Sequence, residues 1–263
     1  MNKKRTYLLI SFLTLILGLA KFAPATIVAQ YVASKTANTI LLTNAQGTIW
    51  DGNAELAINP DQAQIQEVNQ PLVIGQIEWN IKGSSLFLGE LKIEFNWNKV
   101  ESGLLTLSRS NMFLDKLSFD LPANTITTLV PSLSIAQLGG QLHISSPNFS
   151  ISNLNKSNIN PKFSGQILLD WQQASSPLSP INPLGRYQVH MNGVNEQIAI
   201  TVATLNGPLI LEGEGTLSHE NGLQFNANAS AVNSQKQSLT PLLHVLGNET
   251  NLGSGFYKIH IRH

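Results

Sequence analysis

Apolar and polar residues alternate at every second position through most of this chain, and no other sequence feature limits its fold as much. Over residues 73–81 the odd positions other than Gly75 are apolar, and the even positions from Gln76 onward are polar. The same pattern returns over 91–98 and 186–191. Because successive side chains of a strand point to opposite faces, each segment predicts a strand with one apolar and one polar face.

Further strands follow from the same alternation. They are predicted at 49–57, 104–108, 116–121, 140–145, 163–171, 197–205, 209–217, 223–231 and 256–262. Four tight-turn sequences separate strands: Lys82-Gly83, Asn192-Gly193, Asn206-Gly207-Pro208 and Asn221-Gly222. The short spacing between strands predicts antiparallel neighbours. Helices are predicted near 27–43, 124–138 and 238–246, the last two with Leu and Val at helical intervals beside a proline.

A weak internal repeat relates segments about 90 residues apart. IGQIEWNI at 74–81 is similar to SGQILLDW at 164–171, and LGELKIEFNW at 88–97 is similar to LGRYQVHMNG at 184–193. A β-unit with one apolar face cannot bury that face alone, so we expect a sheet that curls over itself. The predicted fold class is mostly β, a curved antiparallel sheet of two weakly repeated β-units with two or three short helices. The halves fall at about 44–135 and 136–263, and the repeat does not distinguish two packed halves from one long sheet.

The N-terminus carries a targeting signal. Lys3, Lys4 and Arg5 precede an apolar run from Tyr7 to Ala20. Positive charge before an apolar run keeps the N-terminus in the cytoplasm, so the rest of the chain is exported. We predict a cytoplasmic tail (1–5), a transmembrane anchor (6–26) and an exported β-domain (27–263). A cleaved signal peptide remains the alternative, because the run is near 15 residues where a span needs about 20, and the sequence Ala-Pro-Ala at 23–25 resembles a cleavage site.

Charge and cysteine content exclude several classes of protein. The 16 Lys+Arg residues balance 16 Asp+Glu residues, and charged residues make up 12% of the chain. Four of the cations lie in the first 21 residues, so the remainder carries a net charge of about −4. This balance argues against a nucleic-acid partner. The absence of cysteine excludes disulfides, thiolate metal sites and cysteine nucleophiles.

No reactive motif emerges from the remaining residues. The histidines, none of which is spaced from another as a helical metal pair, are His143, His190, His219, His244, His260 and His263. HExxH, GxSxG and P-loop sequences are absent. The segment 213–218 begins like a dinucleotide fingerprint, but its third position is Ser218 and it falls in a strand. The sequence therefore predicts no catalytic, cofactor-binding or metal-binding residues, no cofactor and no enzymatic activity.

Carboxylates and tryptophans fit structural roles. Glu212 and Glu214 share a face of one strand, and we expect both to be solvated. The same holds for Glu78 and for Glu94 beside Lys92. Asp51, Glu55 and Asp170 lie near tryptophan in the sequence, which places them at the edge of a core. The tryptophans, which we expect in strands as packing residues, are Trp50, Trp79, Trp97 and Trp171.

Several strings, taken in order, resemble a known family. They are GTIWDGNAEL at 47–56, SPLSPINPLGRYQVHMNG at 176–193, TLNGPLILEGEGTL at 204–217, GLQFNANASA at 222–231 and PLLHVLG at 241–247. Their order across nearly the whole chain resembles the type II secretion system protein N family, also called general secretion pathway protein N. Asn226 departs from the family pattern, which more often has a small residue there.

The resemblance implies a non-enzymatic, single-pass inner-membrane protein with its N-terminus in the cytoplasm and its bulk in the periplasm. Such a protein assists the export of folded proteins across the outer membrane, and its expected partners are other inner-membrane or periplasmic components of that system. The alternative is a periplasmic module that binds lipid or another hydrophobe, because the one-sided sheet also resembles the groove-forming sheets of AsmA-type lipid-transport proteins. For the fold itself, Trp50 and Gly52 are predicted to matter in the first strand. Close strand packing is predicted at Gly207, Pro208, Gly213 and Gly215.

Overall fold

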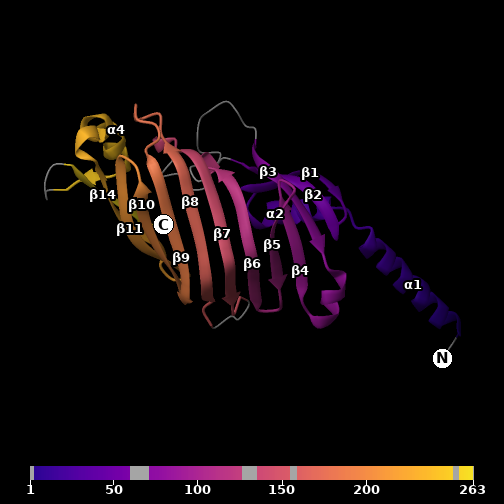
Figure 1. Cartoon of the computed structure of the whole chain (residues 1–263). Coiled ribbons are helices and arrows are strands. Elements are labelled where there is room, and N and C mark those ends of the chain that lie inside the picture. The colour runs from indigo at the N-terminus through magenta and orange to yellow at the C-terminus, as the bar shows by residue number, and fades with distance from the viewer. Residues whose placement is uncertain (1–2, 60–70, 126–134, 155–158, 251–254, 263) are drawn as a thin grey trace.

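A single antiparallel sheet of fourteen strands forms the body of the protein in the computed structural model, which describes residues 3–59, 71–125, 135–154, 159–250 and 255–262 (Figure 1). The strands are β1 (Ile40–Gly47), β2 (Asp51–Ile58), β3 (Leu72–Ile81), β4 (Leu91–Trp97), β5 (Val100–Leu107), β6 (Asn111–Pro122), β7 (Gly139–Ser152), β8 (Lys162–Ser175), β9 (Gly185–Asn195), β10 (Gln197–Asn206), β11 (Leu209–Ser218), β12 (Gly222–Ala231), β13 (Asn248–Glu249) and β14 (Phe256–Arg262). They follow chain order across the sheet, except that β14 lies between β12 and β13. The mostly β, antiparallel fold class is confirmed, and the sheet is one continuous layer.

The helices lie at the two ends of the sheet. They are α1 (Lys3–Lys21), α2 (Thr26–Lys35), the 3-10 turns η1 (Gly83–Leu88) and η3 (Asn233–Gln235), and α4 (Lys236–Leu246). α4 confirms the helix predicted at 238–246, whereas most of the helix predicted at 124–138 lies outside the described residues. No helix in the described part of the chain combines the length and the apolar character needed to cross a membrane, so the anchor at 6–26 stays a prediction.

The first helix and strand predicted for the body were wrong in their boundaries. The helix expected over 27–43 ends at Lys35, because Ala37 and Asn38 adopt positive φ values of 48° and 62° and turn the chain out of the helix. Residues 40–47 instead form β1, and the strand expected at 49–57 begins at Asp51. Trp50 therefore lies in the turn between two strands and not in a strand as predicted.

Strands β5 to β7 extend further than their predicted segments. Lys116 in β6 has a φ of 54°, and the register of β7 on β8 shifts between Ser145 and Asn148. Such irregularities interrupt the alternation of apolar and polar side chains. The period-two pattern consequently revealed only the part of each strand on one side of the break.

Two of the four predicted turns are confirmed, at Asn206-Gly207-Pro208 and Asn221-Gly222. Lys82-Gly83 leads into η1 and not into a two-residue hairpin turn. The prediction of a turn at Asn192-Gly193 was wrong, since both residues are paired within β9. Gly193 faces Gly165 across the sheet, where a Cβ atom would lie 2.5 Å from the backbone nitrogen of Ser164. This glycine serves close strand packing, and the chain reverses after it, between Asn195 and Gln197.

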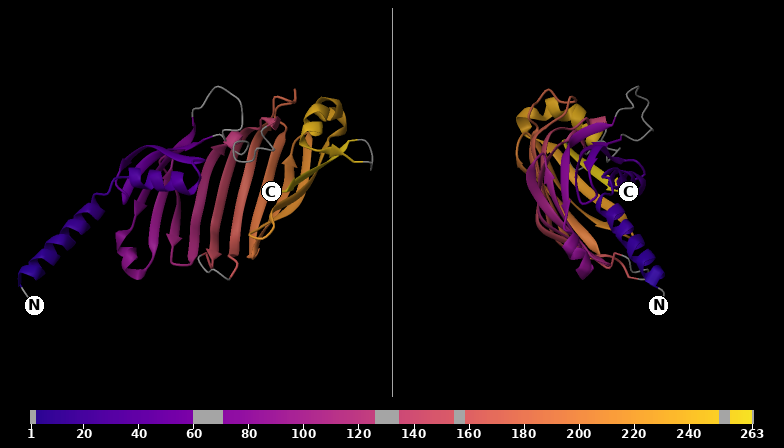
Figure 2. Two further views of the ribbon diagram at one scale, coloured as in Figure 1. Left: turned by 180° about the vertical axis from the view of Figure 1, so that it is seen from behind. Right: turned by 90° about the vertical axis from the view of Figure 1, so that its right-hand side faces the viewer.

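The register places apolar side chains of neighbouring strands on one face of the sheet. Tyr187 of β9 lies opposite Trp171 of β8 and Thr204 of β10, and the next pairs along these strands join Val189 to Leu169 and to Val202. We call this side the apolar face and the other the polar face. Seen end-on, the sheet is curled, with α2 on the inner side of the curl (Figure 2). Because α2 packs against Ala54 and Trp79 of the apolar face, that face lines the inside.

Two cores cover the ends of the apolar face. At the C-terminal end, Leu239, Leu242 and Leu243 of α4 pack against Tyr187, Leu209 and neighbouring residues, all buried. At the N-terminal end, the buried residues Ala25, Ala54 and Trp79 form a smaller core, against which Val28 and Ile77 are partly buried. We refer to these as the C-terminal core and the N-terminal core.

Candidate functional site: the two faces of the sheet

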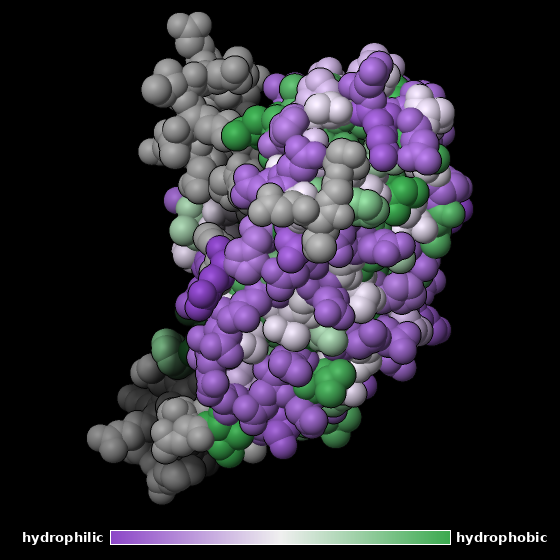
Figure 3. All heavy atoms as spheres, turned by 90° about the vertical axis from the view of Figure 1, so that its left-hand side faces the viewer, coloured by the Kyte–Doolittle hydropathy of each residue, from purple (hydrophilic) through white to green (hydrophobic). Residues whose placement is uncertain are grey.

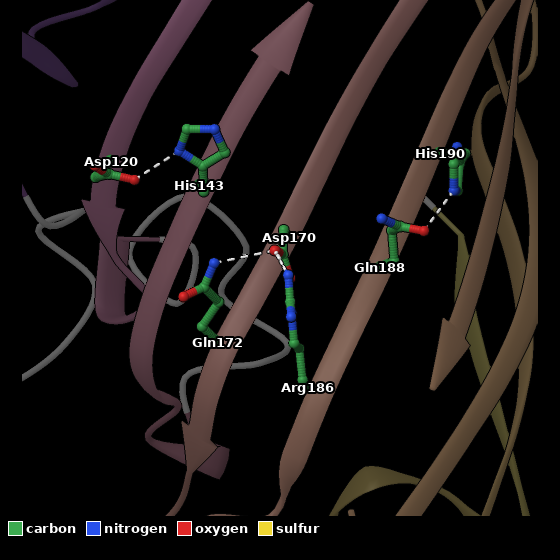
Figure 4. A network of polar contacts seen from close by, with 7 residues as sticks. All are labelled: Asp120, His143, Asp170, Gln172, Arg186, Gln188 and His190. Carbon is green, nitrogen blue, oxygen red and sulfur yellow. Dashed lines mark hydrogen bonds and ion pairs between the residues drawn. The ribbon is translucent and has the colours of Figure 1, made fainter. Parts of the chain in front are cut away.

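A row of polar side chains crosses four strands in the middle of the polar face (Figure 4). Asp120 of β6 lies opposite His143 of β7, His143 opposite Asp170 of β8, and Asp170 opposite Gln188 of β9. Every member occupies a polar position of the alternation, so the antiparallel register brings into one row residues that are far apart in the sequence.

Asp170 is the most enclosed member of this row, with 6% of its surface exposed. Arg186 binds it with two hydrogen bonds, from Nε to Oδ1 at 2.9 Å and from Nη2 to Oδ2 at 2.5 Å, and Gln172 donates a third at 3.0 Å. The hydrogen bonds from Arg186 hold the pKa of the Asp170 carboxyl below its ordinary value, against the opposing effect of burial. Both oxygens of this carboxylate are therefore occupied, which leaves it poorly suited to act as a general base.

His143 in the row is partly buried, His190 beside the row is exposed, and both are bonded to neighbours. His143 Nδ1 lies 2.8 Å from Asp120 Oδ1, and His190 Nε2 lies 2.9 Å from Gln188 Oε1. Among the described residues, no group of three or more histidine, aspartate or glutamate side chains could hold a metal ion. The row offers charged and hydrogen-bonding groups on an open surface, an arrangement suited to protein contacts.

The other residues considered from the sequence are dispersed. Glu212 and Glu214 are exposed on the polar face of β11, as predicted. They line a shallow groove at the C-terminal end with Lys258 and His260, and His260 Nδ1 lies 2.7 Å from Asn226 Oδ1. Hydrophilic residues dominate the surface seen from this end (Figure 3).

The remaining histidines and acids also lie apart. His219 is in the turn after β11, and His244 of α4 packs edge-on against the ring of Tyr257. Asp51 and Glu55 belong to β2, while His263 lies outside the described residues.

All four tryptophans donate their ring N–H to a backbone carbonyl. Trp79, Trp97 and Trp171 lie in strands and bond to Ile49, Asp120 and Gly139 at 3.2, 2.9 and 3.0 Å. Trp50 bonds to Ala20 at the end of α1, at 2.7 Å. The prediction that these residues pack the fold is confirmed for the three strand tryptophans, and Trp50 ties the first helix to the sheet.

The glycines predicted at close strand contacts are confirmed there. A Cβ atom on Gly213 would lie 2.5 Å from the Cβ of Ala227, and one on Gly52 would lie 2.5 Å from the ring of Trp79. On Gly215 it would meet Gln224 and Phe225, and on Gly207 it would meet Gly185. Pro208 follows Gly207, and its carbonyl accepts a hydrogen bond from the Val232 amide.

The apolar face between the two cores is the second candidate surface. Its side chains on the central strands are only half-buried, and they include Leu105, Leu114, Ile144, Leu169, Val189, Met191, Ile200 and Val202. In the described part of the chain, α2 and α4 pack at the two ends of this face. These half-buried side chains give the centre of the apolar face the chemistry of a surface that binds hydrophobic groups.

Sequence reasoning missed the pairing of Asp170 with Arg186 and of Asp120 with His143. Alternation placed all four side chains on one face, but their partners depend on strand register. Only the strand order and the lengths of the turns would have indicated which residues lie opposite each other.

Comparison with known families gives one match. The model of the family described as type II secretion system (T2SS), protein N, matches residues 38–260. No curated protein and no solved structure matches the chain. The matched region begins after α2 and includes every strand from β1 to β14 in whole or in part.

Proposed function

The chain belongs to the type II secretion system protein N family, and from that membership we propose that it acts as a non-enzymatic component that assists export of folded proteins across the outer membrane. The single observation that carries this proposal is the family match over residues 38–260, which spans the whole sheet. The expected partners are other inner-membrane or periplasmic components of the same system.

The polar face supports a role through protein contacts. Asp170 is fully paired with Arg186 and Gln172, and the surrounding row presents Asp120, His143 and His190 to solvent. Charged and hydrogen-bonding groups fixed on a continuous sheet give a partner a rigid pattern to recognise. A contact surface of this kind needs no reactive group.

We propose an inner-membrane location with the N-terminus in the cytoplasm and the sheet in the periplasm. Lys3, Lys4 and Arg5 at the start of α1 support this orientation, since cationic residues stay on the cytoplasmic side. The exposed apolar side chains of α1, which include Ile10, Phe12 and Leu15, support lipid contact.

The proposal is tested by secretion and crosslinking in cells of the source bacterium. Deletion of the gene should leave folded exoproteins in the periplasm. A photoreactive residue at His190 should crosslink to a secretion component, whereas one at Phe225, on the apolar face, should not give that product. Normal secretion in the deletion strain, together with no crosslink to a secretion component, would contradict the proposal.

Binding of lipid or another hydrophobe on the apolar face is the second candidate function. The observation that favours it is the half-buried state of Leu169, Val189 and Met191 between the two cores. An apolar face of this size with no covering helix over its centre in the described residues can hold acyl chains.

Mass spectrometry of the chain purified from membranes in a mild detergent tests this second function. A co-purified lipid that is lost in Met191→Asp would support it. The matched control is Gln188→Asp on the polar face, which should leave lipid content unchanged. Equal lipid content in the parent and both variants would contradict specific binding on the apolar face.

A further inference from the structure

The most exposed apolar side chains of the β-domain lie in η1. Phe87 is 94% exposed and Leu88 79% exposed, and Leu86 beside them is also exposed. We call these three residues the η1 tip. Burial of aromatic and aliphatic side chains is favourable, so a cluster left this open in water indicates contact with another apolar phase.

The η1 tip is held in place by the strands on either side. The Ser85 hydroxyl donates to the Lys82 carbonyl at 2.7 Å and accepts from the Lys92 amide at 3.3 Å, and the Lys82 amide donates to the Lys92 carbonyl at 2.9 Å. Gly89 ends the turn with a φ of 73°, in the left-handed region that suits glycine. These bonds present the apolar side chains outward in a defined position.

A second exposed apolar group surrounds the junction of α1 and α2. Phe22 is 73% exposed, Tyr31 is 64% exposed, and Ile27 between them is half exposed. Lys21 and Lys35 lie 5.8 Å from the rings of Phe22 and Tyr31. We call Phe22, Ile27 and Tyr31 the collar. Aromatic rings with adjacent lysines are typical of the boundary between lipid headgroups and acyl chains.

α2 is apolar on two sides, and the sheet covers only one of them. Val28 packs on the N-terminal core, while Ile27 and Tyr31 face outward. An apolar side of a helix is normally covered by another apolar surface. We therefore expect a second apolar contact on the outer side of α2. This side of α2 continues the exposed apolar surface of α1.

Hydrogen bonds fix α1 to the sheet. Trp50 Nε1 donates to the Ala20 carbonyl at 2.7 Å, and the amide of Ile49 donates to the Ala23 carbonyl at 2.9 Å. Pro24 also forms a bridge with Thr48. The direction of α1 relative to the sheet is thus defined: α1 extends away from the sheet, on the side where β3 ends and β4 begins (Figures 1 and 2).

The length of α1 gives a reason for additional membrane contacts. The apolar run from Tyr7 to Ala20 covers about 21 Å at 1.5 Å per residue, whereas the hydrocarbon core of a bilayer is about 30 Å thick. Interfacial apolar groups enter a bilayer to a depth of about 5–10 Å. This depth is similar to the difference between the length of the apolar run and the thickness of the hydrocarbon core.

We propose that the collar and the η1 tip insert into the outer leaflet of the same bilayer that holds α1. This inference rests on the membrane location given under Proposed function. The sheet is then held on the membrane at two separated points and does not swing on a single helix. The ligand of both surfaces is a phospholipid bilayer, and Lys21 and Lys35 beside the collar favour anionic headgroups.

Single-cysteine labelling tests the proposal, because the chain contains no cysteine of its own. The full chain is labelled with an environment-sensitive nitrobenzoxadiazole dye at Phe87→Cys, Tyr31→Cys or Glu196→Cys and reconstituted into vesicles of phosphatidylethanolamine and phosphatidylglycerol. Glu196 is the control, since it is exposed in the turn between β9 and β10, at the same end of the sheet but far from α1 (Figure 1).

We expect the dye emission to be blue-shifted at positions 87 and 31 and to show no blue shift at position 196. Quenching by externally added dithionite should be at least about tenfold slower at 87 and 31 than at 196, because a dianion does not enter the acyl region. Equal quenching at 87 and 196 would overturn insertion of the η1 tip. Protection at 87 that appeared only in parallel vesicles with an added second secretion protein would overturn it as well, because the occupant would then be protein.

A second variant separates insertion from folding. Phe87→Asp should keep the thermal unfolding midpoint of the parent, because Phe87 packs on almost nothing, yet it should make a dye at the neighbouring position 88 as accessible to dithionite as one at 196. The vesicles of the first experiment contain only lipid and this chain. A negative labelling result there would refute the membrane contacts but would say nothing about the role in secretion. That role is tested separately, by the secretion defect in cells.

Discussion

The two ends of the sheet bury their apolar residues to very different extents. At the C-terminal end, α4 seals a core that has twelve buried residues in the described part of the chain, including Tyr187 and three leucines of α4. At the N-terminal end, the corresponding cluster has three buried residues among those described, surrounded by partly buried Val28, Ile77 and Ile93. Large apolar side chains nearby, such as Phe22 and Tyr31, remain exposed.

This difference indicates that the two ends have different sources of stability. The C-terminal core is complete within the chain, so its stability is intrinsic. The N-terminal core leaves apolar surface for an external phase, so its stability depends on what covers it. Matched substitutions at the two ends of the sheet test this difference in stability.

Leu242→Ala should cost the most stability. Leu242 is fully buried in the C-terminal core, and truncation there leaves a cavity, with an expected cost of about 3 kcal/mol. Val28→Ala in the N-terminal core is the matched variant and should cost about 1 kcal/mol, because Val28 is only partly buried. Urea unfolding of the full chain in detergent micelles measures both, and equal losses would refute the contrast between the two ends.

Gly213→Ala should cost about 2 kcal/mol through overpacking, since its new methyl group would meet Ala227 Cβ at 2.5 Å and the Asn226 carbonyl at 2.8 Å. Gly103→Ala in the N-terminal half meets only the far end of the Phe95 ring at 2.6 Å and the Asp115 carbonyl at 3.3 Å. That ring can move, so the cost should be smaller. Thermal unfolding of the two variants compares them, and a larger loss for Gly103→Ala would show that the N-terminal half is the more rigid.

Asp170→Asn should destabilise the protein at pH 7 by less than either change above, because the Arg186 side chain is half exposed. The folded-state pKa of Asp170 is lowered, so its contribution is complete above the unfolded pKa of about 4 and disappears as pH falls through the folded value. The difference between parent and variant should therefore shrink below about pH 4. Glu94→Gln, which breaks an exposed pair with Lys82, is the control and should show almost no difference at any pH. A difference for Asp170→Asn that is constant from pH 7 to pH 3 would contradict the ion pair.

Trp50→Phe should have the smallest effect on stability, less than about 1 kcal/mol, because it removes one exposed hydrogen bond to Ala20. Its larger effect should be on the angle of α1. In the vesicle experiment, a dye at position 87 should become more accessible to dithionite in this variant, while one at 31 stays protected. Unchanged protection at 87 would show that Trp50 does not set the orientation of the sheet.

The sequence predicted the strands well wherever the alternation was regular. Strands β10 to β12 and β14 were located almost to the residue, because they contain few irregularities and short turns join most of them. The prediction failed at Lys116, where a positive φ interrupts the pattern, and at Gly193, where a turn-like dipeptide lies inside a strand. In both cases contacts with the neighbouring strand override the local preference.

The candidate surfaces were predictable only in part. The alternation predicted an apolar face and a polar face. It could not predict the row of polar side chains from Asp120 to Gln188, because that row depends on the register across four strands. Exposure of the η1 tip was also unpredictable, since SLFLG read as a sequence is equally suited to a buried turn. The three-dimensional path of β3 and β4 is what leaves Phe87 in the open.

The strand order has a consequence for how the chain acquires its structure. From β1 to β12 each strand pairs with the one synthesised just before it, and no strand has to wait for a distant segment. Contacts between consecutive hairpins have a low loop-closure cost, which favours rapid zippering from one end. A chain in which β1 is synthesised first can therefore add one hairpin at a time onto a sheet that already exists. Lengthening or shortening the sheet by a whole hairpin during evolution would preserve this route.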